Sequence, residues 1–328
     1  MMPMQRSNST ECVPDEKAPA ISVVIVNFNG GRFLSACLAS LHEHLSHRRY
    51  EIVVVDNQST DGSREWLAAR DDIVFVPAPT NLGFTGGNNL GAEQARGRVL
   101  LFINNDTIVR STLDPMLDAL DDTLVGLVGC RLVYGDGRQQ FSFGYEHTPL
   151  RLVLSWLGAE KRSWLPSVFR RLETNAHSYA MRHAAVDWVS GACFAMRAED
   201  WRALGGFDTR FFMYCEDVDL CKRVRSLGKR VCYLPDVLVT HYEGGGRSWI
   251  GAAALMRTAD SYLAYSRKHH RRLAGRLMSI CLGTVFLARA LVFWIGGTEL
   301  LRDKAAAFRA AGWKLLGGDE APMPGSRP

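Results

Sequence analysis

The chain has 328 residues and a formal net charge of +5, and 47% of its residues are hydrophobic against 22% charged. This balance is typical of a globular protein with one large domain or two ordinary ones, and it excludes a disordered chain. The eight cysteines include no Cys-x-x-Cys pair, which argues against a zinc ribbon or a disulfide scaffold and favours a reducing compartment. Residues 1–19 are polar and contain Pro3, Pro14 and Pro19 without an apolar centre, so we expect a flexible tail and not a secretion signal.

The first half of the chain alternates β-branched runs with amphipathic segments. Strands are predicted over residues 21–27, 50–55, 73–76 and 99–103, and helices over 34–45, 63–70 and 88–96. This alternation predicts an α/β fold with a mostly parallel central sheet flanked by helices. A common dinucleotide-binding domain is disfavoured, because no Gly-x-Gly-x-x-Gly follows the first strand and the chain has no phosphate loop ending in Gly-Lys-Ser/Thr.

Polar side chains follow the first two strands. The first strand ends in Asn27-Phe28-Asn29 and the second ends at Asp56. Because the carboxyl ends of parallel strands share one edge of the sheet, we expect these side chains to meet there. Amide and carboxylate groups suit the edge of a base or a ribose, and Asp56 can accept the imino proton of a pyrimidine.

The fourth strand stops abruptly at Asn104, Asn105 and Asp106. A carboxylate held at the carboxyl end of a strand can bind a hard divalent cation that bridges phosphate oxygens. Asp106 is therefore a candidate metal ligand, and Asn104 and Asn105 are candidates for contact with the nucleotide. The alternative for Asp106 is a cap on a turn or on the next helix.

Residues 81–89 bring three glycines and three asparagines to the start of a helix. Free backbone N–H groups at a helix start favour an anion, and glycine permits close approach of a ligand. Asn81, Gly86 and Asn88 are accordingly candidates for contact with a diphosphate or a sugar hydroxyl.

In the second half, residues 188–196 predict an apolar strand whose small residues let a substrate approach the backbone closely. Glu216 and Asp217 begin a predicted helix that ends at Gly228. Two acids at a helix start often only complement the helix dipole. The functional alternative is that one of them deprotonates a substrate hydroxyl.

Seven segments in order resemble the family 2 glycosyltransferases of the GT-A fold, within them the bacterial rhamnosyltransferase-like members. The matching segments are residues 23–29, 55–63, 81–89, 104–107, 188–192, 205–208 and 216–220, and together they cover about residues 20–245. Many members of this family carry Asp-x-Asp where this chain has Asn104-Asn105-Asp106. Only the last carboxylate of that motif is present here.

The resemblance implies a metal-dependent glycosyltransferase that uses Mg²⁺ or Mn²⁺. It implies that Asp217 is the catalytic base, that Glu216 positions the acceptor or the base, and that Asp106 is the main protein ligand of the metal. The strand at residues 188–196 is implied to form the floor of the acceptor site. His241 is implied as a second ligand near the diphosphate. Arg247 is a candidate for holding a phosphate, and its alternative is a solvated loop cation. Attack from the face opposite the leaving diphosphate predicts inversion, with no covalent intermediate.

The C-terminal region differs from the rest of the chain. Residues 277–297 form an apolar run broken by Arg289, and the preceding stretch holds a basic cluster, Arg267, Lys268, Arg271, Arg272 and Arg276. The run either spans a bilayer, lies on its surface, or buries one stripe on the catalytic domain. The basic cluster is suited to anionic lipid, with a solvated helix face as the plain alternative and nucleic acid as a weaker one.

These expectations define three regions and one leading function. Residues 1–19 form the tail, residues 20–250 the catalytic domain with a nucleotide-sugar half (20–110) and an acceptor half (111–250), and residues 251–328 a helical extension. The leading function is transfer of L-rhamnose from dTDP-rhamnose to a glycan or polyprenyl-linked acceptor at the inner face of the cell membrane, in the cytoplasm, during cell-surface polysaccharide assembly. The alternatives are another hexosyl or galactofuranosyl transferase, a nucleotidyltransferase, and a non-catalytic scaffold or regulator that binds a sugar nucleotide; no nucleic-acid partner is expected.

Overall fold

The computed structural model describes residues 19–159, 162, 164–181, 184–242, 251–296 and 298–317. Residues 1–18 of the predicted tail and the candidate Arg247 lie outside these ranges. The strands are β1 (Ile21–Asn27), β2 (Tyr50–Asp56), β3 (Val74–Pro77), β4 (Val99–Ile103), β5 (Thr107–Val109), β6 (Val125–Val133), β7 (Phe143–Gly144), β8 (Ala184–Ala185), β9 (Trp188–Val189), β10 (Cys193–Arg197) and β11 (Arg230–His241). The helices are α1 (Gly31–Leu45), α2 (Ser63–Ala68), α3 (Gly83–Gln94), α4 (Asp114–Asp118), α5 (Pro149–Trp156), α6 (Ala176–Met181), α7 (Ala198–Leu204), α8 (Glu216–Ser226), α10 (Ala252–His269), α11 (Arg272–Ile295) and α12 (Glu299–Leu315), with short 3-10 turns at Ala119–Asp121 and Ser167–Phe169.

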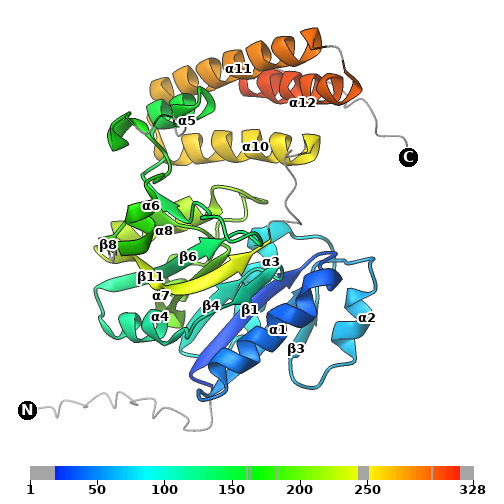
Figure 1. The fold of residues 1–328 in the computed structure, drawn as a ribbon, viewed down its shortest axis with the longest axis vertical. Helices are drawn as coiled ribbons and strands as arrows, with labels where there is room; N and C mark the ends of the chain where they lie inside the picture. The colour runs from blue at the N-terminus through cyan, green and yellow to red at the C-terminus, as the bar shows by residue number, and fades with distance from the viewer. Residues whose placement is uncertain are drawn as a thin grey trace, which may run out of the picture.

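One large sheet with strand order β3-β2-β1-β4-β10-β6-β11-β5 forms the centre of the molecule (Figure 1). Strands β3, β2, β1 and β4 pair in parallel, as the alternation of strands and helices predicts. The second half is mixed, because β10 runs antiparallel to both β4 and β6, and β5 runs antiparallel to β11. The expected α/β architecture is confirmed, with β3, β2, β1 and β4 forming the all-parallel part of the sheet and β6 and β11 a further parallel pair.

The parallel register sets the strand-end edge. Asn27 is the partner of Asp56 in the β1–β2 ladder, so both strands end at the same level. Helix α3 packs closely on β1 because it carries glycines on the contact face. A Cβ atom added to Gly87 would lie 2.8 Å from a methyl carbon of Val26, and one added to Gly91 would lie 2.6 Å from a methyl carbon of Val24. This close contact places the start of α3 beside the end of β1.

Several predicted elements differ in their bounds from those of the structure. Helix α3 begins at Gly83 and not at residue 88, so the glycine-rich segment is its first turn. The strand expected over 188–196 is two strands: β9 pairs with β7 in a small separate sheet, and β10 joins the main sheet. The turn at Ser190–Ala192 separates them. Residues 231–234 and 237–240 belong to one strand, β11, whose register shifts between Leu234 and Leu238 around Pro235, which has no N–H for the ladder.

Helices α10, α11 and α12 form a layer at the end of the molecule farthest from β1 and β3, and α5 lies against them (Figure 1). The expected helical extension is confirmed. On α11, Met278, Leu282 and Phe286 are buried within this layer. Its other face is apolar and exposed, with Leu273, Leu277, Ile280, Leu291, Val292 and Ile295 each more than half exposed. By length and composition alone, α11 is the one described helix that is long and apolar enough to cross a membrane.

Candidate active site

The carboxyl ends of β1, β2 and β4 bring three predicted binding residues into one network. The Asn27 Nδ2 atom donates to Ser63 Oγ at 2.8 Å and to Asp56 Oδ1 at 3.3 Å. The Asn27 Oδ1 atom accepts a hydrogen bond of 2.8 Å from Asn105 Nδ2. Asn27 and Asp56 are fully buried and Asn105 is partly exposed. The two buried side chains thus form a rigid base beneath Asn105.

The loops after β1 and β2 are tied to each other by side chains. Asn29 adopts a left-handed backbone with φ of 53°, and its Oδ1 atom accepts a 2.7 Å hydrogen bond from the Thr60 N–H. Asp56 accepts from the Ser59 N–H at 3.3 Å and pairs with Arg64 at 3.4 Å. The carboxylate of Asp56 is therefore held by neighbouring groups of its own loop and of α2.

The three candidates of the glycine-rich segment have local structural contacts. Asn81 Oδ1 accepts hydrogen bonds of 3.0 Å from Asn57 Nδ2 and from the Gly83 N–H. Asn88 is buried and donates to the Phe84 carbonyl at 2.8 Å, within α3. A Cβ on Gly86 would lie 2.7 Å from Leu82 Cβ. Asn57 was not identified from the sequence, although its place directly after Asp56 in the matched segment is a signal that points to it.

The start of α3 also contacts the segment that leads into α8. The Phe84 N–H donates to the Phe212 carbonyl at 2.9 Å. Gly83 has a φ of 69°, and a Cβ there would lie 2.4 Å from the same carbonyl oxygen. The absence of a side chain at Gly83 thus lets the start of α3 meet the segment before α8 at this point.

The two candidate metal ligands are neighbours. His241 Nε2 lies 3.3 Å from Asp106 Oδ1 and 3.2 Å from Asn104 Nδ2, an amide donor. The His241 Nδ1 atom lies 3.1 Å from Gln140 Oε1. These partners assign the proton to Nδ1 and leave the Nε2 lone pair on the side of Asp106. Gln140 was not identified from the sequence, because it lies between the predicted elements and outside the matched segments.

These side chains suit a divalent cation that is held partly by the protein and partly by a bound diphosphate. One carboxylate and one imidazole nitrogen are groups that bind Mn²⁺, and Mg²⁺ is commonly held by one or two carboxylates together with phosphate oxygens and water. Among the described residues, no group of three or more His, Cys, Asp or Glu side chains is placed to hold a metal ion. Asp106 and His241 therefore fit a site that a diphosphate and water complete.

The predicted catalytic acids begin helix α8. Asp217 Oδ2 accepts a 3.2 Å hydrogen bond from the Gly191 N–H, and Asp217 Oδ1 accepts from the Val218 N–H at 2.8 Å. Gly191 lies in the turn between β9 and β10, and a Cβ there would be 3.6 Å from Asp217 Cβ. The expected acceptor floor therefore contacts the predicted base directly.

Burial perturbs both acids. Loss of hydration raises the pKa of Asp217, although N–H groups of Val218 and Gly191 and the charge of Arg171 act in the opposite direction. Burial, followed by the charge of Asp217, raises the pKa of Glu216 well above its ordinary value. The Glu216 Oε2 atom is buried with no hydrogen-bond partner among the described residues. Burial therefore favours the protonated form of Glu216 more strongly than that of Asp217.

Glu216 and Asp217 line a cavity of about 500 Å³ between the sheet domain and the helical layer. The remaining lining residues are His147, Ser155, Trp156, Gly158, Arg171, Trp188, Tyr214, Cys215, Val218, Thr258, Tyr262 and Arg289. Of all the residues that line this cavity, the sequence identified only Asp217, Glu216 and Trp188 as candidates for a functional site. The sequence marks Arg289 as unusual, since it interrupts an apolar run, but it does not indicate which side of the helix the Arg289 side chain faces.

The third acid of the motif, Asp219, joins two layers. Its carboxylate is fully buried, accepts from Arg223 Nε at 2.8 Å, and lies 2.7 Å from both Lys268 Nζ and His269 Nε2. Lys268 and His269 lie near the end of α10. Lys268 of the basic cluster and its neighbour His269 therefore face inward, while Arg267, Arg271, Arg272 and Arg276 are exposed.

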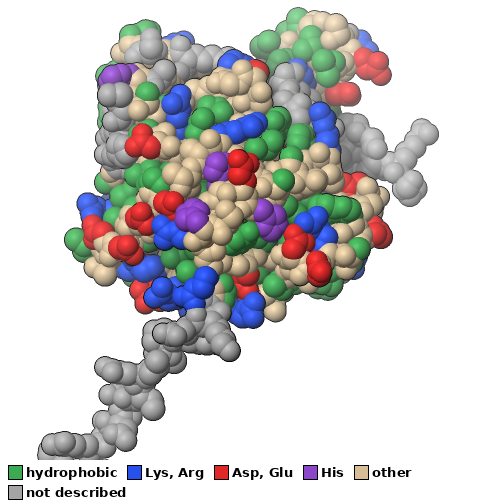
Figure 2. Space-filling view, turned by 60° about the horizontal axis from the view of Figure 1, so that its bottom comes forward, with side chains coloured by type: hydrophobic (Ala, Val, Ile, Leu, Met, Phe, Trp, Pro, Cys, Tyr) green, Lys and Arg blue, Asp and Glu red, His purple; other side chains and the backbone are tan. Residues whose placement is uncertain are grey.

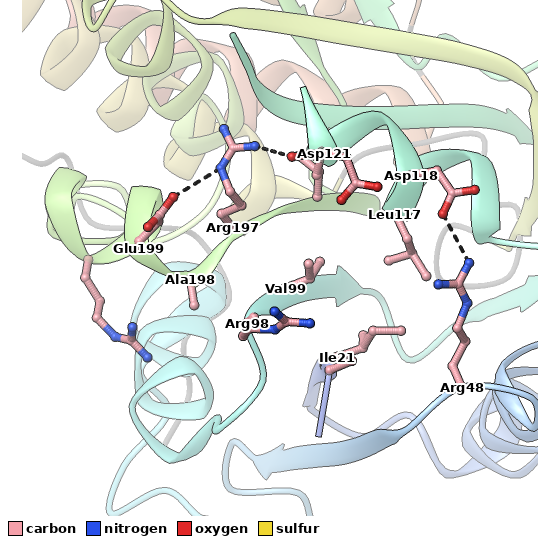
Figure 3. Close-up of a pocket in the computed structure, with 13 residues that line it drawn as sticks. Ile21, Arg48, Arg98, Val99, Leu117, Asp118, Asp121, Arg197, Ala198 and Glu199 are labelled. Carbon is pink, nitrogen blue, oxygen red and sulfur yellow. Dashed lines mark hydrogen bonds and ion pairs between the residues drawn. The ribbon is translucent and has the colours of Figure 1, made fainter. Parts of the chain in front are cut away.

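A second cavity of about 430 Å³ lies at the opposite edge, where β1 and β4 begin (Figure 3). Lys and Arg side chains gather at the lower edge of the face in Figure 2. In the cavity, Arg48 pairs with Asp118 at 3.1 Å and Arg197 pairs with Glu199 at 3.5 Å. These cations already have acidic partners, and the predicted site residues lie at the other edge of the sheet.

Comparison with known proteins gives consistent matches. The sequence model of glycosyl transferase family 2 matches residues 22–199. The chain is 36% identical to rhamnosyltransferase WbbL of Escherichia coli K12, over 79% of this chain and 98% of that protein. It is 29% identical to N-acetylglucosaminyl-diphospho-decaprenol L-rhamnosyltransferase of Mycobacterium tuberculosis, over 68% of this chain and 76% of that protein.

Other relatives are much longer than this chain. The chain is 28% identical to O-antigen biosynthesis protein RfbC of Myxococcus xanthus over 77% of its own length, but it spans only 19% of RfbC. It spans 26% of protein y4gI of Sinorhizobium fredii. In these two comparisons the similarity therefore covers only a segment of the longer protein.

Two solved structures share the fold. The mannosyltransferase PcManGT from Pyrobaculum calidifontis, in complex with GDP-Man and Mn²⁺, has a TM-score of 0.54 at 19% identity and covers 91% of this chain and 87% of that one. GalNAc-T7 with UDP, GalNAc and Mn²⁺ has a TM-score of 0.53 at 18% identity and covers 77% of this chain and 51% of that one. The expected GT-A architecture is thereby confirmed.

Proposed function

The chain belongs to the family 2 glycosyltransferases, and we propose that it transfers a sugar from a nucleoside-diphosphate donor to a hydroxyl of a glycan or lipid-linked glycan in cell-surface polysaccharide assembly. The observation that carries this proposal is the Asp217 carboxylate, held by the Gly191 N–H on the wall of the 500 Å³ cavity. A carboxylate fixed in a cavity of this size is suited to take a proton from a bound hydroxyl.

L-Rhamnose from dTDP-rhamnose is the proposed donor. Its support is the names of two relatives, rhamnosyltransferase WbbL and the decaprenol-linked L-rhamnosyltransferase. The second name also supports an acceptor that carries N-acetylglucosamine on a polyprenyl diphosphate. Another hexose or galactofuranose is the alternative donor within the same family.

Donor binding is assigned to the strand-end edge and the start of α3. We assign to the nucleotide the network of buried Asn27 and Asp56 with partly exposed Asn105, together with Asn29 on the loop after β1. The remaining proposed contacts are Asn81, Gly86, Asn88 and Asn104, together with Arg247 outside the described residues. The polar groups at this edge are mainly amides, which can contact a base, a ribose or a sugar without adding charge.

A divalent cation, Mg²⁺ or Mn²⁺, is assigned to Asp106 and His241, and when bound it supplies positive charge to the leaving diphosphate. The proton of His241 on Nδ1 is directed at Gln140 Oε1, which orients the ring. The two solved structures described above contain Mn²⁺ together with UDP or GDP-Man, and this supports the assignment.

The chemistry proposed for the cavity is a single displacement with inversion. The acceptor oxygen forms a bond to the anomeric carbon while the bond from that carbon to the diphosphate oxygen breaks. The proton of the acceptor hydroxyl passes to Asp217, and the leaving electron pair stays on the nucleoside diphosphate. Glu216, kept protonated by burial, donates a hydrogen bond that positions the acceptor or the base.

We divide the chain into a nucleotide-sugar half (20–110), an acceptor half (111–250) and a helical extension (251–328). The extension is assigned to peripheral contact with an anionic membrane, on the cytoplasmic face. Its support is a groove of about 1090 Å³ lined by Arg267, Arg271, Arg272 and Arg276 beside Leu273 and Ile280. Arginines next to exposed apolar side chains favour a surface that carries both charge and hydrocarbon.

The test is release of nucleoside diphosphate from a panel of sugar nucleotides, measured with and without Mn²⁺ or Mg²⁺ and with membrane lipid extract as the acceptor. We expect metal-dependent turnover of dTDP-rhamnose, with one anomeric configuration in the product opposite to that of the donor. Binding of a sugar nucleotide without turnover in the presence of extract would favour the non-catalytic scaffold instead. Release of diphosphate from a nucleoside triphosphate would favour a nucleotidyltransferase.

A further inference from the structure

Arg289 is the one charged residue in the apolar stretch 277–295 of α11. Its Nη2 atom donates to the Trp156 carbonyl at 2.7 Å, and its guanidinium carbon lies 5.4 Å from the Trp156 ring centroid and 5.8 Å from that of Phe308. Arg289 thus turns inward, towards α5 and α12, and away from the exposed face of its own helix.

Within the described part of the chain, Arg289 forms no ion pair with a carboxylate, in contrast to Arg223 beside Asp219 or Lys222 beside Glu146. Burial lowers the pKa of its guanidinium, and no acidic neighbour raises it again. A half-buried cation without a counter-ion is costly in a folded protein. Such a group is expected where an anion binds.

The cavity that Arg289 lines also contains both predicted catalytic acids. A second cation, Arg171, lines the same cavity, and its charge acts on Asp217. Trp156, Trp188, Tyr214 and Tyr262 are aromatic lining residues, which suit the apolar faces of a sugar ring. One cavity therefore combines a base for a hydroxyl, aromatic rings for a sugar, and a cation for an anionic group.

We propose that the helical layer completes the acceptor site, and that Arg289 binds a phosphate or diphosphate group attached to the acceptor sugar. This inference rests on the proposed function, because it gives the sugar in the cavity the role of acceptor. Guanidinium recognises phosphate oxygens with paired N–H donors. Val292, three residues after Arg289 on the same helix, is exposed, so a lipid joined to that phosphate would find apolar surface one turn further along α11.

The test measures binding of geranyl diphosphate to the full chain by titration calorimetry, with saturating dTDP present to fill the donor site. Geraniol and inorganic diphosphate are the two comparison probes, which separate the contribution of the lipid from that of the phosphate. The variants are Arg289→Gln, which can keep the hydrogen bond to the Trp156 carbonyl, and Arg289→Lys, which keeps the charge. Arg309→Gln is the matched control, because Arg309 is exposed on the neighbouring helix α12.

We expect Arg289→Gln to weaken geranyl diphosphate binding at least tenfold, Arg289→Lys to restore part of it, and Arg309→Gln to leave it unchanged. Inorganic diphosphate bound as tightly as geranyl diphosphate would assign the site to a free phosphate and not to a lipid. Equal affinity of the wild type and Arg289→Gln, with unchanged melting temperature, would overturn the proposal. A failure of the proposed function would give a different result, because the protein would then turn over no sugar nucleotide.

Discussion

The side chains of Asp106 and His241 lie 3.3 Å apart, measured from Oδ1 to Nε2. Asp106 directly precedes β5, and His241 is the last residue of β11. The two strands are antiparallel, with His241 opposite Thr107, and the Tyr242 N–H donates to the Asp106 carbonyl at 2.9 Å. The backbone ladder therefore fixes the separation of the two candidate metal ligands.

From this geometry we expect Asp106→Asn to raise the Mn²⁺ concentration for half-maximal turnover at least tenfold, because the amide is a neutral and weaker ligand. His241→Asn should weaken metal dependence by a smaller factor, about tenfold or less, since Asp106 remains. Metal titrations of donor turnover measure both effects. Asp136→Asn, at an exposed carboxylate paired with Arg138, is the control. Identical titration curves for Asp106→Asn and the control would remove Asp106 from the metal site.

Glu216 makes a prediction about stability and pH. Its pKa is raised in the folded protein, so the folded state holds a proton that the unfolded state releases, and the free energy of unfolding falls as pH rises from the ordinary pKa towards the folded one. The Gln side chain of Glu216→Gln cannot ionise, so the free energy of unfolding of this variant does not fall for this reason as pH rises. The variant should therefore gain stability over the wild type as pH rises, by about 1.4 kcal/mol for each tenfold difference in proton affinity between the two states.

Urea denaturation between pH 5.5 and 8.5 measures this difference. Glu199→Gln is the control, because the Glu199 side chain is 75% exposed. A stability difference between Glu216→Gln and the wild type that stays constant with pH would show that Glu216 is ionised throughout, and would remove its role as a hydrogen-bond donor.

Asp219 makes a prediction about the helical layer. Asn at this position leaves Arg223, Lys268 and His269 around a neutral side chain, and breaking a buried ion pair costs about 3 kcal/mol. The pKa of Asp219 is lowered, so its contribution is present at neutral pH and is lost only as pH falls below its ordinary pKa. Asp219→Asn should thus lower the melting temperature by several degrees at pH 7. A melting temperature equal to that of Asp136→Asn would contradict the role of this cluster in holding α10 to α8.

The strand-end half of the site was readable from the sequence because its residues follow strands directly. A β-branched run places Asn27 and Asp56 at the carboxyl edge, and parallel pairing then brings them together. The pairing of Asp106 with His241 required the antiparallel contact of β5 with β11, which no local pattern encodes. Strand β6 was not anticipated either, although β11 pairs with it over most of its length.

The acceptor half was less readable, for a physical reason. Its cavity is formed by residues from α5, α8, α10 and α11, and helix packing between such distant segments leaves no fixed spacing in the sequence. The periodic apolar run of α11 indicates a long helix. Because both faces of this helix are apolar, its sequence does not indicate which face packs on α12. Lys268 and His269 likewise read as part of a basic surface, whereas Asp219 draws both of them inward.

The central claim is that Asp217 takes the proton of the acceptor hydroxyl. The direct measurement is kcat for transfer from the active sugar nucleotide by the wild type and by Asp217→Asn, together with calorimetric binding of the nucleoside diphosphate. The account predicts that Asp217→Asn loses at least 100-fold in kcat, within the range for a general base, and keeps the nucleotide affinity of the wild type. In the wild type, kcat should fall at low pH with an apparent pKa above the ordinary pKa of Asp. An Asp217→Asn variant that retains the wild-type kcat would contradict the account.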